Sequence, residues 1–371
     1  MRIGIFINTA WNIYNFRRGI VKDLLSADHQ MFAIAPVDDY VSKLEDLGCR
    51  FVPMPMSASG INPVEDLLLI NRIKKVIQTY QIDLILTYTI KPNIYGSLVA
   101  RRLGIPVICN VSGLGTTFIQ ANVVSYLARL LYKFSIVHAD HTFFQNADDQ
   151  QLFTSKVPLR EGSYSLLNGS GVDLSYFQYQ APPENEAPIF LMIGRPMVEK
   201  GIYEYVEAAR ILKERGIKCF FQILGRWDKG EKRSVSESEM AIWEQEGILN
   251  YLGTSDDVRP VIKEVDAVIL PSYREGTPRT LLEAGAMGKP LITTDVPGCR
   301  HVVDDGFNGF LCEPASGLSL ANAIVKFLNL DDRQKLKMGE NSRKAIEKKF
   351  DEKAVIESYN EIISRLGKSA S

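Results

Sequence analysis

The chain has 371 residues, of which 46% are apolar and 23% are charged, and this composition is typical of a soluble globular protein with two domains of ordinary size. The formal net charge of −1 argues against a general affinity for nucleic acids, because it leaves no broad basic surface. Residues 1–170 carry 16 Lys and Arg against 13 Asp and Glu, whereas the rest of the chain carries 27 against 31. The N-terminal half is therefore slightly basic, which suits an anionic acceptor or a membrane surface.

The cysteines and the N-terminus indicate the cellular compartment. Five scattered cysteines, none in Cys-x-x-Cys spacing, argue against a disulfide framework or a zinc site and favour a reducing compartment. The apolar stretch 1–7 is too short for a signal peptide, and no apolar run approaches the roughly 18 to 20 residues that span a bilayer. We therefore expect a cytoplasmic protein, either free or peripheral at the inner face of the plasma membrane.

Apolar strands alternate with amphipathic helices through the first half of the chain. Strands are expected at 2–7, 31–35, 50–54, 83–87, 105–109, 140–145 and 164–167, and helices at 16–27, 62–80, 92–103 and 122–137. Short, continuously apolar strands between helices predict a parallel sheet covered on both faces. The helix at 122–137 is apolar on all sides, which favours burial in the core over a position on a membrane surface.

The alternation stops once and then restarts. Residues 176–188 contain three prolines and several acids without periodicity, which indicates a linker. Further strands are expected at 189–193, 219–224, 266–270 and 290–293, with a last polar helix near 351–366. The sequence thus predicts an N-terminal domain over 1–175, a C-terminal domain over 189–350, and a terminal segment 351–371 that packs back on the N-terminal domain. Because such sheets bind ligands outside the carboxyl ends of their strands, a cleft between the two domains is the expected site.

The stretch Pro271-Ser-Tyr-Arg-Glu-Gly-Thr-Pro-Arg-Thr-Leu-Leu-Glu-Ala284 carries the strongest chemical signal. We expect Thr277 to cap the helix that follows and Pro278 to occupy its first turn. The helix N-terminus would then offer N–H groups and a positive dipole to an anion. Glu275 precedes this helix and Glu283 lies inside it, so the two carboxylates can reach different parts of one ligand, such as the paired hydroxyls of a ribose or a hexose.

A second segment places two cations beside another helix start. Arg195 and Lys200 lie between the expected strand 189–193 and the helix after it. An arginine fork and a lysine point charge at a helix N-terminus suit a diphosphate and can neutralise the charge that develops when a nucleotide diphosphate leaves.

With these two segments, the sequence resembles the retaining glycosyltransferases of family 4, which have the GT-B fold: two Rossmann-like, doubly wound parallel-sheet domains that face each other across a cleft. The matching pieces of the C-terminal half are Gly194-Arg195, Lys200-Gly201, Leu224-Gly225, Leu270-Pro271-Ser272, Glu275 with Glu283, and Gly288-Lys289-Pro290. The N-terminal half is similar to bacterial enzymes that build polysaccharides or glycans on polyprenyl-diphosphate carriers. Its matching pieces are Phe16-Arg17, Lys91-Pro92-Asn93, Val111-Ser112-Gly113-Leu114-Gly115 and Asn168-Gly169-Ser170-Gly171-Val172-Asp173.

The resemblance implies a role for each matching residue. Arg195 and Lys200 would hold the donor diphosphate, Glu283 the ribose hydroxyls, and Glu275 the transferred sugar, which makes Arg195, Lys200 and Glu275 the catalytic candidates. The backbone of the donor-site loop would assist at Gly276, Thr277, Pro278, Thr280 and Leu281. Candidates near the acceptor or the transferred sugar are Asn15, Arg17, Lys91, Ser112 and Gly113; for the first three, solvated residues at a helix start are an equally good explanation.

The resemblance also implies retention of the anomeric configuration and independence of metal ions and cofactors. The chain contains no Asp-x-Asp, the motif with which metal-dependent glycosyltransferases of the other major fold hold a cation. Many relatives place a His where Ser112 stands, and a serine hydroxyl cannot replace it as a general base. This difference fits a mechanism in which the leaving phosphate accepts the proton of the acceptor on the same face.

The sequence therefore predicts a metal-independent, retaining hexosyltransferase. It would transfer glucose or an N-acetylhexosamine from a UDP-sugar, such as UDP-glucose, to a saccharide on a polyprenyl-diphosphate carrier in surface polysaccharide biosynthesis. Another enzyme of the same fold, such as a nucleotide-sugar epimerase, and a non-catalytic sugar-nucleotide binder remain as alternatives. A nicotinamide-dependent oxidoreductase is disfavoured, because residues 8–19 after the first strand lack Gly-x-Gly-x-x-Gly.

Overall fold

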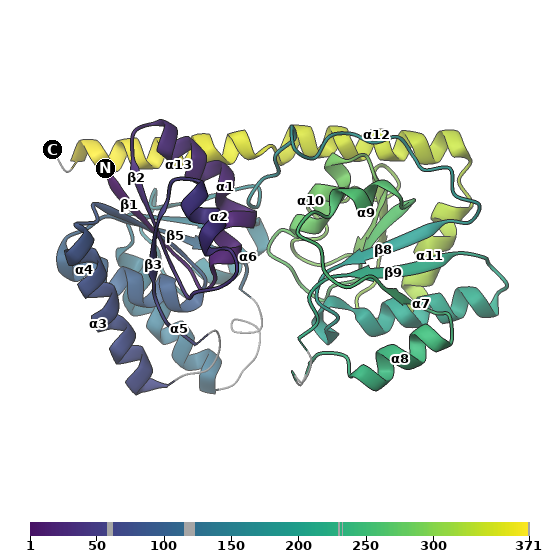
Figure 1. Cartoon of the computed structure of the whole chain (residues 1–371), viewed down its shortest axis with the longest axis horizontal. Coiled ribbons are helices and arrows are strands. Elements are labelled where there is room, and N and C mark those ends of the chain that lie inside the picture. Colours follow the sequence, from purple (N-terminus) through teal and green to yellow (C-terminus); the bar gives the residue numbers. More distant parts are fainter. Residues whose placement is uncertain (58–61, 115–122, 229–230, 232, 370–371) are drawn as a thin grey trace. The chain divides into compact units, whose positions relative to one another are not determined.

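The computed structural model describes residues 1–57, 62–114, 123–228, 231 and 233–369, and it forms two compact units. Unit 1 contains Met1–Ser170 together with Glu352–Ser371, and unit 2 contains Gly171–Asp351. Each unit is a parallel sheet with helices between its strands (Figure 1). Gly115, the last residue of the matching piece Val111-Ser112-Gly113-Leu114-Gly115, lies outside the described residues.

The sheet of unit 1 has seven parallel strands in the order β3-β2-β1-β4-β5-β6-β7. They are β1 (Arg2–Phe6), β2 (Gln30–Ala35), β3 (Arg50–Pro53), β4 (Leu84–Tyr88), β5 (Val107–Val111), β6 (His141–Phe144) and β7 (Tyr164–Leu166). The chain turns back at β1, so that β4 pairs with its other edge and the next strands continue outward. This order is that of a doubly wound fold, and the predicted fold class is confirmed.

The helices of unit 1 cover both faces of this sheet. They are α1 (Ala10–Ser26), α2 (Val41–Asp46), α3 (Pro63–Tyr80), a π-helix (Pro92–Gly96) continued by α4 (Ser97–Leu103), α5 (Val123–Ser135), a 3₁₀ turn (Ile136–His138), α6 (Ala147–Thr154) and α13 (Glu352–Ser369). Helix α1 begins six residues before the expected start at 16, because the side chain of Thr9 accepts a hydrogen bond from the N–H of Asn12 and caps the helix there.

The last helix of the chain packs on the first elements of unit 1. Val355, Tyr359 and Ile363 of α13 share one apolar cluster with Ile5 of β1 and Ile13 of α1. Figure 1 shows α13 beside α1. The opposite face of the sheet is covered by α3, α4 and their neighbours.

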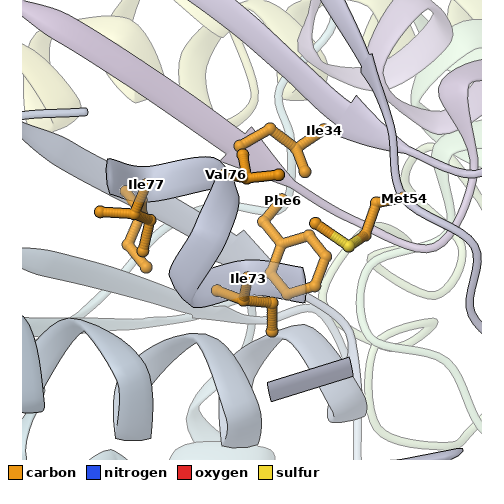
Figure 2. A pocket seen from close by; sticks show the side chains of 7 residues that line it. Phe6, Ile34, Met54, Ile73, Val76 and Ile77 are labelled. Carbon is orange, nitrogen blue, oxygen red and sulfur yellow. The ribbon is translucent and has the colours of Figure 1, made fainter. Parts of the chain in front are cut away.

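The core on that opposite face is closely packed. A small gap in this core has a volume of about 10 Å³ and is lined by apolar side chains such as Phe6, Met54 and Ile73 (Figure 2). A space of this size corresponds to a single water molecule, and its walls offer no polar partner for one. We therefore interpret it as a packing defect.

Helix α5 differs from the expectation. Ala128 and Tyr132 are buried, but the opposite face presents Tyr126 and Phe134 with 61% and 62% of their surface exposed. The prediction that apolar residues all around this helix mean burial is therefore wrong for one of its faces. A helix of this composition needs only one face against the core, and the sequence pattern alone did not show that the other face is left exposed by the described part of unit 1.

Unit 2 repeats the same topology with six parallel strands in the order β10-β9-β8-β11-β12-β13. The strands are β8 (Ile189–Ile193), β9 (Phe220–Leu224), β10 (Asn250–Tyr251), β11 (Ala267–Leu270), β12 (Leu291–Thr294) and β13 (Gly309–Cys312). Its helices are a 3₁₀ turn (Val198–Lys200), α7 (Ile202–Glu214), α8 (Glu237–Gln245), α9 (Arg259–Lys263), α10 (Arg279–Ala286), α11 (Gly317–Leu328) and α12 (Asp332–Lys349).

The segment 176–188 contains no helix or strand, yet it is attached to unit 2. Phe177 lies in the apolar cluster of that unit, and Arg343 of α12 donates to its carbonyl oxygen at 2.7 Å. The N–H of Gln180 donates to the carbonyl oxygen of Met287 at 3.0 Å.

None of the helices that the structure describes combines the length and the apolar character needed to cross a membrane.

Candidate functional site

The candidate site of unit 2 lies at the point where its strand order reverses. Strands β8 and β11 are neighbours, with Phe190 opposite Ala267, and the chain continues from them in opposite directions across the sheet. The loops that follow them are 194–201 and 271–278, and both leave the carboxyl ends of these strands. Doubly wound folds bind their ligands at this point of the sheet.

The two loops approach each other so closely that one position must be glycine. Gly201 has φ +75°, and a Cβ atom there would lie 2.0 Å from the carbonyl oxygen of Pro271. The N–H of Tyr273 donates to the carbonyl oxygen of Glu199 at 3.0 Å, which bonds the loops directly. Gly201 is also the residue directly before α7, so this contact fixes its other neighbour, Lys200.

Lys200 and Glu275 form an ion pair across the two loops. The Nζ atom of Lys200 lies 2.5 Å from Oε1 of Glu275, and the hydroxyl of Ser272 donates to the same oxygen at 2.7 Å. The side chains of Lys200 and Glu275 are 30% and 14% exposed, so the pair is partly shielded from solvent and still reachable by a ligand. Charge-assisted hydrogen bonds in such surroundings are stronger than those at the surface.

The backbone of Glu275 is fixed as well. Its N–H donates to the carbonyl oxygen of Pro297 at 3.2 Å. Gly298 has φ +86°, and a Cβ atom at this position would lie 2.4 Å from the carbonyl oxygen of Glu275. The backbone that carries the carboxylate is therefore positioned by the loop after β12 as well as by its own loop.

Arg195 is held much more loosely. Its guanidinium lies 3.4 Å from a carboxylate oxygen of Asp228 and 4.0 Å from one of Glu231, and the side chain is 49% exposed. Exposed ion pairs of this kind contribute little to stability. An anionic ligand can therefore draw Arg195 from its acidic neighbours at low cost.

Helix α10 begins later than predicted. Its first residue is Arg279, and the residue before the helix is Pro278, which is extended at ψ 110° and makes no side-chain capping bond. The prediction that Thr277 caps the helix is wrong, because the extended backbone of Pro278 places Thr277 one residue too early. The N–H of Leu281 donates to the carbonyl oxygen of Pro278 at 3.1 Å.

Glu283 lies one turn into this helix and faces Arg279. The Nε atom of Arg279 lies 3.0 Å from Oε1 of Glu283, and the Glu283 side chain is 13% exposed. Burial raises the pKa of Glu283, and the positive charge of Arg279 opposes this shift. The pair keeps the carboxylate available as a hydrogen-bond acceptor at the start of the helix.

Of the residues expected from the sequence, the structure joins Lys200 directly to Glu275, whereas Arg195 and Glu283 have other partners. Sequence reasoning missed three participants, which are Ser272, Asp228 and Arg279. Ser272 lies inside the stretch Pro271–Ala284, and this position could have indicated that it takes part in the site. Nothing in the sequence connected Asp228 with Arg195.

Unit 1 has a pocket of about 320 Å³ at its own reversal point, beside the carboxyl ends of β1, β4 and β5. Three of the five predicted acceptor-side residues line it: Lys91, Ser112 and Gly113. Asn8 and Thr89, which follow β1 and β4, also line it and were not predicted.

The predicted residues in this pocket are tied to the surrounding structure. Lys91 is bonded to Asp66 at 3.0 Å and donates to Ser57 at 2.8 Å. The hydroxyl of Ser112 donates to Oδ1 of Asn110 at 2.8 Å. The amide of Asn110 in turn donates to the hydroxyl of Tyr359 on α13 at 2.9 Å, so the last helix supports the pocket wall.

Asn15 and Arg17 are not among the residues that line the pocket. Arg17 is buried, with its guanidinium 4.5 Å from the ring centroid of Tyr88 and a bond to the carbonyl oxygen of Phe16. Interpreting Arg17 as a solvated helix-start residue is therefore wrong. The side chain of Asn15 donates to the carbonyl oxygen of Trp11 one turn earlier.

Two family models match this chain. Residues 2–146 match the family described as glycosyl transferase 4-like, and residues 177–345 match the family described as glycosyl transferases group 1. The first match lies in unit 1 and the second lies in unit 2.

Two curated relatives and one solved structure extend this result. The chain is 29% identical, over the full length of both proteins, to the N,N'-diacetylbacillosaminyl-diphospho-undecaprenol α-1,3-N-acetylgalactosaminyltransferase of Campylobacter jejuni. It is 25% identical to the UDP-Gal:α-D-GlcNAc-diphosphoundecaprenol α-1,3-galactosyltransferase of Escherichia coli, over 84% of this chain and 81% of that one. The structure of Anabaena HepE in complex with UDP and glucose superimposes with a TM-score of 0.78 at 17% identity, covering 98% and 99% of the two chains, and shows the common fold.

Proposed function

Because the chain belongs to the glycosyltransferases with the GT-B fold, we propose that it is a retaining, metal-independent hexosyltransferase. Its donor is a UDP-sugar, and its acceptor is a saccharide carried on a polyprenyl diphosphate in surface polysaccharide biosynthesis. The observation that supports this most strongly is the Lys200–Glu275 pair at the reversal point of unit 2, close in sequence to Arg195 and to the start of α10.

The donor diphosphate is assigned to the two cations. Arg195 gives a planar fork that suits phosphate oxygens, and Lys200 gives a point charge that a phosphate draws away from Glu275. The backbone at Gly276, Thr277 and Thr280 lies beside the start of α10, where an anion is favoured. Glu283 accepts hydrogen bonds from the ribose hydroxyls, and Glu275 accepts them from the transferred sugar.

The identity of the donor sugar is a narrower proposal. The Escherichia coli relative is named for UDP-galactose, and the Campylobacter jejuni relative is named for the transfer of N-acetylgalactosamine. Among glucose and the N-acetylhexosamines, the name of the Campylobacter jejuni relative favours a UDP-N-acetylhexosamine.

The transfer step follows from the residues present. The bond between the anomeric carbon and the diphosphate oxygen breaks, and the acceptor hydroxyl bonds to that carbon on the same face. The leaving diphosphate takes the hydroxyl proton, since Ser112 is too weak a base for this task. Arg195 and Lys200 stabilise the negative charge that grows on the diphosphate, and this is where their contribution to the rate arises.

The acceptor is assigned to the pocket of unit 1. Both relatives are named for acceptors with a saccharide on diphospho-undecaprenol. The pocket has the volume for a sugar residue and is lined by polar side chains from Asn8, Lys91 and Ser112.

A lipid-linked acceptor calls for contact with a membrane surface, and α5 supplies a suitable face. The exposed apolar residues of this helix are Tyr126, Leu127, Leu130 and Phe134. Residues 84–139 contain no Asp or Glu but carry five cations: Lys91, Arg101, Arg102, Arg129 and Lys133. Apolar anchors beside the basic side chains of Arg129 and Lys133 suit the anionic inner face of the plasma membrane, where we place the protein as a peripheral enzyme.

A screen for slow donor hydrolysis tests the enzymatic proposal directly, because it requires no acceptor. We expect one UDP-N-acetylhexosamine or UDP-glucose to release UDP, with unchanged rates in the presence of a chelator. The variant Arg195→Ala with Lys200→Ala is expected to lose both UDP affinity and turnover. Turnover that disappears on chelation and returns with manganese, or a failure of all sugar nucleotides to bind at millimolar concentration, would overturn the proposal.

A further inference from the structure

Thr89, the first residue after β4, has an unusual backbone conformation. Its φ angle is +68°, in the left-handed region that β-branched residues strongly avoid. Asp28 and Gln81 share this region but follow the ends of α1 and α3, where a left-handed residue often closes a helix. Thr89 instead follows a strand at the reversal point of its sheet. Strain at such a place is typical of ligand-binding sites.

The side chain of Thr89 adds a second unfavourable feature. Its hydroxyl oxygen is shielded from solvent and has no hydrogen-bond partner among the residues that the structure describes. A buried hydroxyl without a partner loses its bonds to water and gains nothing in return, so native structures rarely keep one without a reason. A valine would fill the same space at no such cost.

A network of buried side chains imposes this arrangement. The carbonyl oxygen of Thr89 accepts the N–H of Asn93 at 3.0 Å, in the turn that leads into the π-helix. The side chain of Asn93 accepts from Thr87 at 2.8 Å and donates to the carbonyl oxygen of Asn110 at 2.9 Å. Since both neighbouring strands fix Asn93, the backbone of Thr89, which carries the hydroxyl, is held in place before any ligand arrives.

The surroundings indicate what the hydroxyl would bind. Thr89 lines the pocket of unit 1 together with Asn8, Lys91 and Ser112. The charge of Lys91 is already compensated by Asp66 at 3.0 Å, with both side chains largely shielded from solvent. A pocket with neutral hydroxyl and amide groups and a compensated cation suits a neutral, oxygen-rich ligand better than an additional anion.

We propose that Thr89 is a binding residue for the saccharide end of the acceptor, and that its hydroxyl forms a hydrogen bond with a hydroxyl or amide group of that sugar. This inference rests on the proposed function. The diphosphate of the carrier is not the partner of Thr89.

The test uses the full chain with a short-chain acceptor, farnesyl-diphospho-N-acetylglucosamine, at a saturating concentration of the UDP-sugar. Thr89→Val keeps the β-branched shape and removes the hydroxyl, and Thr89→Ser keeps the hydroxyl. We expect Thr89→Val to raise the KM for the acceptor about tenfold, the usual loss for one hydrogen bond, while Thr89→Ser stays within about threefold of the wild type. Thr154→Val, which removes a hydroxyl bonded to its own helix α6, is the matched control.

Three further measurements separate the alternatives. Farnesyl diphosphate, which lacks the sugar, should inhibit the wild type and Thr89→Val equally well. If Thr89→Val weakened this inhibition as much as it raises the KM for the acceptor, the hydroxyl would bind the diphosphate, and the proposal would be overturned. An unchanged acceptor KM, or a parallel fall in the melting temperature and in UDP affinity, would also overturn it. If the wild type hydrolyses UDP-sugars without glycosylating this probe, the proposed acceptor fails, and Thr89 is judged by calorimetric binding of methyl N-acetylglucosaminide, which Thr89→Val must weaken.

Discussion

The ammonium nitrogen of Lys200 lies 2.5 Å from Oε1 of Glu275, so the cation predicted for the diphosphate and the carboxylate predicted for the sugar are bonded to each other. A diphosphate that attracts Lys200 leaves Glu275 with the hydroxyl of Ser272 as its partner. In the proposed donor complex, the same event frees the carboxylate oxygens for the hydroxyls of the transferred sugar. We therefore propose that binding of the nucleotide part and orientation of the sugar are coupled through this ion pair.

This coupling predicts different effects for the two residues. Glu275→Gln keeps the size of the side chain but removes its charge, and we expect kcat to fall at least about 100-fold while the Kd for UDP does not rise, because Lys200 is no longer held by a carboxylate. Lys200→Met removes the charge-assisted bond to the phosphate, and we expect the Kd for UDP to rise about 10- to 100-fold. Calorimetry with UDP and initial-rate kinetics measure the two effects.

The control for these variants is Lys213→Met, at an exposed lysine of unit 2 that donates to the carbonyl oxygen of Glu246. It should leave UDP affinity unchanged. If Glu275→Gln weakened UDP binding as much as Lys200→Met did, Glu275 would belong to the nucleotide subsite and its assignment to the sugar would be wrong.

A second prediction concerns the glycine at which the two loops meet. Gly201→Ala places a methyl group 2.0 Å from a backbone oxygen of Pro271, at φ +75°. We expect a destabilisation of more than about 3 kcal/mol, because neither backbone can yield without shifting Lys200. Chemical denaturation and turnover should both report the change.

Gly216→Ala is the matched control for backbone strain. Gly216 has φ +71° and nothing within 4 Å of the added Cβ, so only the conformational cost of about 1 kcal/mol remains. Equal losses at the two positions would mean that the contact with Pro271 does not restrain the loop.

Most of the strands, and the loops that follow them, could be predicted from the local pattern of apolar residues. Arg195, Lys200 and Glu275 stood out because each lies in a short loop between an apolar strand and a helix start, and the resemblance to family 4 supplied their expected roles. The short strands β10 and β13 were missed, since β10 has two residues and β13 lies among turn residues. The capping function of Thr9 was also missed, and the first helix was therefore placed too late.

The sequence could not predict relationships between distant positions. Lys200 and Glu275 are 75 residues apart, and the hydroxyl of Tyr359 meets Asn110 across 249 residues. Thr89 gave no signal at all, because a left-handed conformation has a sequence signature only where glycine or asparagine occupies the position. These features arise from the tertiary structure, which imposes a geometry that local preferences do not favour.

A third prediction follows from His141 on β6. Burial lowers the pKa of His141 from 6.5 to about 4, and the positive charge of Arg365 adds to this shift. The unfolded chain therefore binds a proton between these pH values that the folded chain does not. The stability from the neutral, buried ring is complete above pH 6.5 and is lost as the pH falls towards 4, by at most about 3 kcal/mol.

Melting temperatures measured from pH 7 to pH 4.5 test this directly. His141→Gln should flatten the decline, at the expense of some stability at pH 7 because the ring packs on Phe143 and bonds to Ser165. The same substitution at His301, in unit 2, controls for the loss of a histidine as such. A decline of equal steepness in His141→Gln would assign the acid sensitivity to other groups.

The last prediction concerns the exposed face of α5. Tyr126, Leu130 and Phe134 follow one another at intervals of four residues, so they lie along one side of the helix, with Arg129 and Lys133 beside them. If this face contacts the membrane, its apolar side chains leave water on binding, and the basic residues gain from anionic lipids. Replacing the three apolar residues by serine should lower the affinity for anionic vesicles at least about tenfold, because each side chain contributes about 1 kcal/mol or more when it is buried.

Cosedimentation with vesicles of phosphatidylglycerol and phosphatidylethanolamine measures this affinity, and vesicles of phosphatidylcholine alone give the neutral reference. Phe220→Ser is the matched control, since Phe220 in unit 2 is 52% exposed and belongs to β9. Wild-type binding should weaken with added salt, as basic contacts require.

The triple variant should still hydrolyse UDP-sugars at the wild-type rate, because α5 belongs to unit 1 and the donor residues belong to unit 2. Equal vesicle binding by the triple variant and Phe220→Ser would show that α5 does not form the membrane contact, and the exposed apolar face of this helix would then require another partner.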